Sequence, residues 1–384
     1  MINIKTVYLD NSATTEIKHE VLESMLPYMK SSYGNPSSIY SLGLASKQAI
    51  EDARTKVANA INADPSEIYF TSGGTESDNW AIKGIIFNHL NDHIDPHIIT
   101  TQVEHPAVYN SCKYLEHRLA DVTFLPVDNT CTININQLKN TIQDNTVLLS
   151  IMYANNEVGS IQPIKEISDI AKKHKIILHT DAVQAVGHTK IDVKELGVDL
   201  LSMSGHKFHA PKGIGALYVK KGTSIDQYLN GGSQEKNFRA GTENVANIVG
   251  MGKAIELATN NIEQDIEYIK QLRNLLISGI MNNISNCYLN SCSSNTLPGI
   301  VNITFERINA ETLLLLLNNA GIFASAGSAC SSHSNDPSRT LMAMGLSEQD
   351  AHSSVRFSIG TLNSVDDINY TVSKLIDIVD YLRS

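Results

Sequence analysis

Short runs of apolar and β-branched residues alternate with helix-like segments between about residue 68 and residue 219. Several of these runs are continuously apolar, which is the pattern of strands that are covered on both faces. Helix-like segments at 76–88, 108–117 and 164–174 separate some of them. This alternation predicts a mostly parallel sheet with helices on both faces. The predicted strands are 68–70, 98–101, 122–125, 147–153, 176–180, 200–203 and 216–219.

The pattern changes after residue 250, where a long amphipathic stretch leads away from the predicted sheet. A smaller α+β unit follows, and we place the boundary near residue 257. Its strands are expected at 300–305 and 355–358, and its helices at 310–320 and 365–382. We therefore predict three parts, namely an N-terminal arm of residues 1–15 that packs with the small domain, a large domain of residues 16–257, and a small C-terminal domain of residues 258–384.

The composition is that of an ordinary globular protein, with 42% hydrophobic and 18% charged residues in 384. A net charge of -10 argues against a general affinity for nucleic acids or anionic membranes. No apolar run approaches the roughly 20 residues of a membrane-spanning helix, and the first residues lack a signal-peptide pattern. The five cysteines form no Cys-x-x-Cys motif. We therefore expect a cytoplasmic protein that binds neither nucleic acid directly nor a membrane, and no metal.

Polar side chains follow five of the predicted strands. Ligands of open parallel sheets bind outside the carboxyl ends of the strands, so these segments are expected to share one edge. A single polar loop would say little, but five together indicate a ligand site. The segments are Thr71-Ser72-Gly73-Gly74-Thr75-Glu76, Glu104-His105, Asn155-Asn156-Glu157, Asp181 with Gln184, and Ser204-Gly205-His206-Lys207.

The chemistry of these segments fits one cofactor. Gly73-Gly74-Thr75 opens a predicted helix, whose free N–H groups can hold a phosphate, although it can also be a simple tight turn. Asp181 can face a protonated pyridine nitrogen, or it can cap the following helix. Lys207 is a candidate Schiff-base lysine, the alternative being a surface lysine in a loop. Ser204 and His206 are spaced to reach the same phosphate.

At these residues the sequence resembles the cysteine desulfurases, within the class V aminotransferase group of fold-type I pyridoxal-phosphate enzymes. The resemblance covers nearly the whole chain, and its ordered set of motifs is far more specific than any one of them. The motifs are Tyr8-Leu9-Asp10-Asn11-Ser12-Ala13-Thr14-Thr15, Gly34-Asn35-Pro36-Ser37-Ser38, Thr71-Ser72-Gly73-Gly74-Thr75-Glu76-Ser77, Asn155-Asn156-Glu157-Val158-Gly159, Ser204-Gly205-His206-Lys207, Arg239-Ala240-Gly241-Thr242-Glu243-Asn244, Gly327-Ser328-Ala329-Cys330 and Val355-Arg356-Phe357-Ser358.

The resemblance implies a role for each residue around the cofactor, pyridoxal 5'-phosphate, which the large domain should bind. Lys207 should attach the cofactor covalently, Asp181 should pair with the pyridine nitrogen, and Gln184 should bond the ring hydroxyl. His105 should stack on the ring and transfer protons, and Asn156 should contact the cofactor. The phosphate should be bound by Gly74, Thr75, Ser204 and His206. Thr242 should complete the phosphate site from a neighbouring subunit, so a homodimer is part of the prediction.

The resemblance also implies the reaction. Asn35, Asn156 and Arg356 should bind L-cysteine, and the small domain should carry the Cys330 thiol that receives its sulfur as a persulfide. L-alanine would be released, and the sulfur would pass to an iron–sulfur scaffold or to a tRNA- or cofactor-thiolating enzyme. Cys330 argues against a plain aminotransferase but not against a selenocysteine lyase. A non-catalytic scaffold is disfavoured by the presence of Lys207, Asp181 and His105 together.

Overall fold

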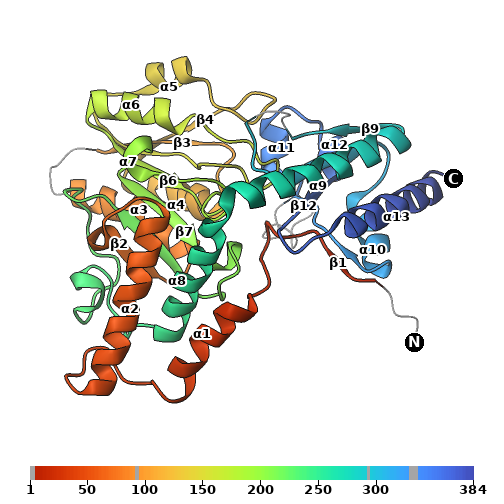
Figure 1. Cartoon of the computed structure of the whole chain (residues 1–384). Coiled ribbons are helices and arrows are strands. Elements are labelled where there is room, and N and C mark those ends of the chain that lie inside the picture. Colours follow the sequence, from red (N-terminus) through yellow and green to blue (C-terminus); the bar gives the residue numbers. More distant parts are fainter. Residues whose placement is uncertain (1–4, 91–94, 292–294, 328–335) are drawn as a thin grey trace.

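All seven predicted strands form one sheet in the computed structural model, which describes residues 5–90, 95–291, 295–327 and 336–384 (Figure 1). The strand order is β2-β8-β7-β6-β5-β3-β4, and the strands from β7 to β4 are parallel. β8 runs antiparallel to both of its neighbours. The strands are β2 (Ile68–Thr71), β3 (His97–Thr101), β4 (Asp121–Leu125), β5 (Thr146–Ser150), β6 (Ile177–Asp181), β7 (Leu200–Ser204) and β8 (Gly215–Val219).

Helices cover both faces of this sheet, as predicted. Successive residues of one strand enter different cores: Leu148 packs with α3 and α4, whereas Leu149 packs with α2, α6 and α8. This alternation is the period of two expected of a strand, and it explains why both positions are apolar. The helices of this part are α1 (His19–Lys30), α2 (Ser41–Ala60), α3 (Gly74–Leu90), α4 (Pro106–Glu116), α5 (Ile135–Thr141), α6 (Ile164–His174), α7 (Val193–Leu196) and α8 (Val245–Asn260).

One strand ends earlier than predicted. β5 stops at Ser150, although the N–H groups of Ile151 and Tyr153 still donate hydrogen bonds to carbonyls of β6. The neighbour on its other side, β3, pairs with β5 only as far as Ile99 with Leu149. Beyond that point the backbone ladder continues on the β6 side only.

A smaller unit is built on a three-stranded antiparallel sheet in the order β12-β10-β9. Helices α9, α10 and α13 pack on it, and Phe305 and Phe357 are fully buried between them. Its elements are α9 (Ile262–Asn283), β9 (Cys287–Leu289), β10 (Ile300–Phe305), α10 (Ala310–Asn319), β11 (Ile322–Phe323), α11 (Arg339–Ala343), α12 (Glu348–His352), β12 (Ser354–Ser358) and α13 (Val365–Arg383).

The N-terminal segment lies against this smaller unit. β1 (Val7–Tyr8) pairs with β11 in parallel, and Val7 and Leu9 belong to the same hydrophobic core as Phe305 and Phe357. The other large cores contain residues between Val21 and Ala258 only. These separate cores support the predicted division into arm, large domain and small domain, which we retain as a proposal. Within the described ranges, no helix is long and apolar enough to cross a membrane.

Candidate active site

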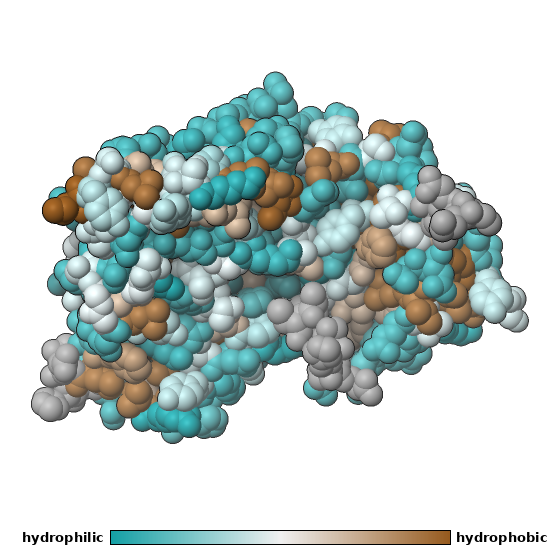
Figure 2. Space-filling model, turned by 90° about the horizontal axis from the view of Figure 1, so that it is seen from below, coloured by the Kyte–Doolittle hydropathy of each residue, from teal (hydrophilic) through white to brown (hydrophobic). Residues whose placement is uncertain are grey.

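Most of the predicted site residues line one cavity of about 190 Å³ between the main sheet and the smaller unit. Figure 2 shows the molecule from below, where its surface is hollowed between the larger and the smaller part. The strand ends of β2, β6 and β7 and the N-terminus of α4 all contribute. The predicted residues that line the cavity are Gly74, Thr75, His105, Asn156, Asp181, Gln184, Ser204, His206, Lys207 and Arg356.

The N-terminus of α3 forms one end of the cavity. Gly74 and Thr75 are its first residues, so their N–H groups have no carbonyl partner within the helix. A Cβ atom at position 74 would lie 2.7 Å from a methyl group of Val183 and 3.5 Å from the Cβ of Ser204. Glycine therefore allows a close approach here. Ser204 and His206 line the same cavity, so this end can hold a phosphate.

Lys207 ends a short helix, η2 (Gly205–Lys207), that directly follows β7. Its ammonium group donates hydrogen bonds to the carbonyl oxygens of Ser12 and Ala13, the latter at 2.9 Å. Both residues line the cavity too. The N-terminal segment thus fixes the amine at the cavity wall.

Asp181 ends β6, the parallel neighbour of β7, and is 6% exposed. Burial raises the pKa of Asp181 to about 6, although a hydrogen bond from the N–H of Val183 and the charge of Lys207 lower it. A buried carboxylate of this kind is stabilised by a cationic partner. A protonated pyridine nitrogen is such a partner, so Asp181 fits the predicted cofactor.

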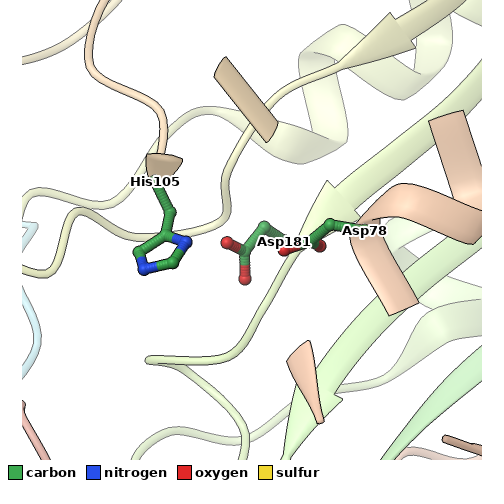
Figure 3. A group of neighbouring side chains, drawn as sticks. All are labelled: Asp78, His105 and Asp181. Carbon is green, nitrogen blue, oxygen red and sulfur yellow. The ribbon is translucent and has the colours of Figure 1, made fainter. Parts of the chain in front are cut away.

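A second carboxyl group, that of Asp78, lies behind Asp181 (Figure 3). Burial raises the pKa of Asp78 well above its usual value, and the charge of Asp181 raises it further. Its Oδ1 is 3.6 Å from the Nε2 of His179 and has no hydrogen-bond partner among the described residues. Asp78 was not predicted from the sequence. Its position four residues after Gly74, on the same helix face, is the signal that could have found it.

His105 begins α4 as its N-cap. Its Nδ1 accepts a hydrogen bond of 3.2 Å from the N–H of Ala107, so the proton of the neutral ring is on Nε2. Burial, together with the charges of Lys207 and Arg339, lowers the pKa of His105 to about 4. The ring is therefore neutral at neutral pH and can lie against another aromatic ring in the cavity.

Asp78, His105 and Asp181 also offer three possible metal ligands, whose atoms lie within 4.8 Å of one another (Figure 3). The ammonium group of Lys207 is near enough to lower the pKa of His105, and the same positive charge would repel a metal cation. The prediction that no metal binds remains a prediction.

The smaller unit contributes Arg356 from β12. One of its terminal nitrogens lies 2.7 Å from a carboxylate oxygen of Asp10, and the other donates a 3.0 Å hydrogen bond to the carbonyl of Asn156. The Nε atom is buried and has no partner among the residues that the structure describes. A substrate carboxylate at this end of the cavity would share the guanidinium with Asp10.

Three predicted residues are not brought to this cavity. Asn35 is exposed, and its side-chain oxygen accepts a 2.9 Å hydrogen bond from the N–H of Ser37. Thr242 is exposed as well, in the loop before α8. Cys330 lies outside the described residues. The roles predicted for these three residues remain predictions.

Comparisons with known proteins fit this geometry. The family model for class-V aminotransferases matches residues 7–371. The chain belongs to the class-V aminotransferase family. A protein of Methanosarcina thermophila named cysteine desulfurase IscS is 53% identical over 99% of this chain and 93% of that protein. A protein of the same name from Clostridium botulinum is 50% identical over 99% of this chain and 96% of that protein.

Solved structures of similar proteins extend the comparison. A NifS-like protein is 36% identical, with a TM-score of 0.92 over 98% of this chain and 100% of the other. A structure titled "SspA in complex with cysteine" is 38% identical, with a TM-score of 0.82 over 94% and 100%. The predicted family and the predicted fold class, a mostly parallel seven-stranded sheet with a smaller C-terminal α+β part, are therefore confirmed.

Glu104 adds a pH dependence to this class-V aminotransferase fold. Its side chain is buried beside His105, and one oxygen accepts hydrogen bonds from the N–H of Met152 and the hydroxyl of Thr101. The other oxygen has no partner among the described residues. Burial raises the pKa of Glu104 to about 8, whereas an unfolded glutamate titrates near 4.5. The folded protein therefore holds a proton here that the unfolded chain releases.

We expect Glu104→Gln to make the free energy of unfolding less dependent on pH between about 4.5 and 8. The stabilisation from the raised pKa is complete below about 4.5 and is lost as pH rises toward about 8. The cofactor-free wild type should lose up to about 1.4 kcal/mol of unfolding free energy per pH unit relative to the variant in this range. Urea denaturation at several pH values measures this difference. Glu166→Gln on the exposed side of α6 is the control, and a constant difference between wild type and Glu104→Gln would contradict the expectation.

Proposed function

We propose that this chain is a cysteine desulfurase that uses pyridoxal 5'-phosphate to convert L-cysteine into L-alanine, with the sulfur retained as a persulfide on Cys330. The observation that carries the proposal is the convergence of an amine, a buried carboxyl group and a helix N-terminus on one cavity. These are the three groups that a phosphorylated pyridine aldehyde requires. The names of the similar proteins support the choice of L-cysteine as the substrate.

The cavity residues divide among the parts of the cofactor. The N–H groups of Gly74 and Thr75, with Ser204 and His206, would hold the phosphate. Asp181 would face the pyridine nitrogen. Lys207 would form the Schiff-base bond, and Gln184 would donate a hydrogen bond to the ring hydroxyl. His105 and Asn156 would lie beside the ring. The bound cofactor supplies an electron sink that stabilises negative charge on the substrate Cα.

The chain's own residues orient the substrate and move its protons. Arg356 would bind the substrate carboxylate, assisted by Asn156 and, as predicted from the resemblance, by Asn35. The Lys207 amine, once free, would take the proton from the substrate Cα. His105 is neutral at neutral pH and carries its proton on Nε2, so it can donate a proton within the cavity.

Cys330 would receive the sulfur. Its thiolate attacks the sulfur of the bound substrate, so a sulfur–sulfur bond forms while the bond between the substrate Cβ and its sulfur breaks. The electron pair of the broken bond stays on the substrate, which gains protons and leaves as L-alanine. One L-cysteine and one enzyme thiol give one L-alanine and one enzyme persulfide, so no external oxidant is needed.

We further propose that the enzyme acts as a homodimer in which Thr242 of each chain reaches the phosphate bound by the partner. The exposure of Thr242 in the single chain supports this arrangement. The persulfide would then pass to an acceptor protein, either an iron–sulfur scaffold or a tRNA- or cofactor-thiolating enzyme.

An assay of the purified protein tests the proposal. With pyridoxal 5'-phosphate, L-cysteine and a thiol reductant, we expect L-alanine and sulfide in equal amounts. Without the reductant, alanine release should stop after about one equivalent per Cys330. Selenocysteine is assayed in parallel, because faster turnover of it would assign the chain to the selenocysteine lyases instead. A protein that binds the cofactor but releases no alanine from either amino acid would overturn the proposal.

A further inference from the structure

Glu157 is a buried acidic residue that the proposed mechanism does not use. Its side chain is 7% exposed, and it directly follows Asn156, which lines the cavity. Its backbone is fixed from two sides, because its N–H donates to the side chain of Asn155 and its carbonyl accepts from Asn302 of the smaller unit. The carboxyl group therefore has a defined position at the junction between the two units.

Both oxygens of this carboxyl group accept hydrogen bonds from one short segment. The hydroxyl of Ser338 donates to Oε2 at 2.5 Å, and the hydroxyl of Thr340 donates to Oε1 at 3.1 Å. Ser338 also caps α11 by accepting from the N–H of Leu341. One carboxyl group thus holds the start of α11.

Gly327 approaches the same carboxyl group from the other direction. A Cβ atom at this position would lie 3.1 Å from Oε2 of Glu157 and 3.7 Å from the Cβ of Ser338. Its φ angle of +80° favours glycine as well. The preceding strand-like contact, in which Ser325 and Arg356 exchange backbone hydrogen bonds of 3.1 and 2.7 Å, ties this segment to the cavity residue Arg356.

Gly327 is the last described residue before the segment that carries Cys330, and Ser338 is the third described residue after it. Cys330 is three positions after Gly327, and an extended chain covers at most about 3.6 Å per residue. The Cα of Cys330 therefore stays within roughly 11 Å of that of Gly327, wherever the intervening residues lie. Fixing Gly327 and Ser338 beside Glu157 consequently limits the space that the thiol can explore.

We propose that Glu157 is a positioning residue for sulfur transfer, which bonds the segment after Cys330 through Ser338 and Thr340 and lies close to Gly327 on the segment before it. This inference rests on the proposed function, because it assumes that Cys330 accepts the sulfur. Glu157 does not touch the substrate. Loss of the Glu157 carboxyl group should slow the attack of the Cys330 thiolate on the substrate sulfur. The earlier reaction of substrate with cofactor should be unaffected, because it does not depend on the position of the thiol.

The decisive variant is Ser338→Ala in the cofactor-loaded enzyme. Two rates are measured after rapid mixing with L-cysteine, namely the absorbance change of the cofactor and the appearance of persulfide on Cys330 by mass spectrometry of quenched samples. We expect persulfide formation to slow roughly ten- to a hundredfold. The absorbance change should stay within about twofold of wild type, because the cofactor contacts are unchanged. Glu157→Gln should act in the same direction.

The chain offers a matched control in Ser347→Ala. Ser347 also caps a five-residue helix, α12, and also donates to a carboxylate, that of Asp350, but away from Glu157. Both rates should stay near wild type in this variant and in the hydroxyl-preserving Ser338→Thr. Thermal unfolding of all variants monitors folding.

The inference is overturned if Ser338→Ala and Ser347→Ala slow persulfide formation equally, or if Ser338→Ala slows both measured rates to the same extent. A wild-type enzyme that releases alanine without persulfide on Cys330 would instead overturn the proposed role of Cys330, and this inference with it.

Discussion

Replacing Lys207 with alanine is expected to lower alanine release from L-cysteine by about a thousandfold or more, because in the proposed mechanism one amine both attaches the cofactor and takes the substrate proton. General acid–base catalysis alone contributes about 10²- to 10⁴-fold. The variant also loses the ammonium group that lies against the carbonyls of Ser12 and Ala13. Alanine release with added pyridoxal 5'-phosphate, together with the cofactor absorbance spectrum, measures both consequences.

Lys212→Ala is the matched control for this experiment. Lys212 lies five positions further along the chain and is exposed, so its removal should leave the rate near that of wild type. A Lys207→Ala enzyme that kept more than a tenth of the wild-type rate would remove Lys207 from the mechanism.

Replacing Cys330 with alanine is expected to slow the release of the first equivalent of alanine roughly a hundredfold or more in the absence of an added reductant. The substrate should still bind and change the cofactor spectrum, because the residues that hold the cofactor and the substrate carboxylate are unaltered. Alanine release and the absorbance change are measured on the same preparation. The two variants thus differ in kind, since Lys207→Ala should abolish the spectral response and Cys330→Ala should preserve it.

Cys287→Ala serves as the control for Cys330→Ala, because Cys287 is a partly exposed thiol in β9 with its sulfur 3.1 Å from the carbonyl of Ile284. Unchanged alanine release by Cys330→Ala without any thiol would show that another group accepts the sulfur.

The sequence could predict the sheet and most of the cavity because both depend on local signals. Most of the seven strands are buried on both faces and therefore read as apolar runs, whereas β4 is partly exposed. Residues such as Asp181 and Lys207 directly follow strands, and parallel strands end at a common edge. The antiparallel direction of β8 could not be predicted, because periodicity carries no information about strand direction.

Other features arise only from tertiary contacts. The partner of Arg356 is Asp10, 346 positions earlier in the chain, and the carboxyl group of Asp78 meets Asp181 only through packing of α3 on β6. Helices α2 and α8 were not predicted because small residues form part of their contact. A Cβ at Gly252 would lie 2.8 Å from Ala53, so part of this contact is made by small residues, which give a weak apolar signal in the sequence.

The N-terminal segment that braces Lys207 has a consequence for biosynthesis. Residues 7–13 leave the ribosome long before β11 and Arg356, which pair with β1 and Asp10. The nascent chain can fold much of its central sheet early, but residues 7–13 cannot form these contacts until β11 and Arg356 have been translated. The cavity is therefore complete only after Arg356 has been translated, because this residue forms part of its wall.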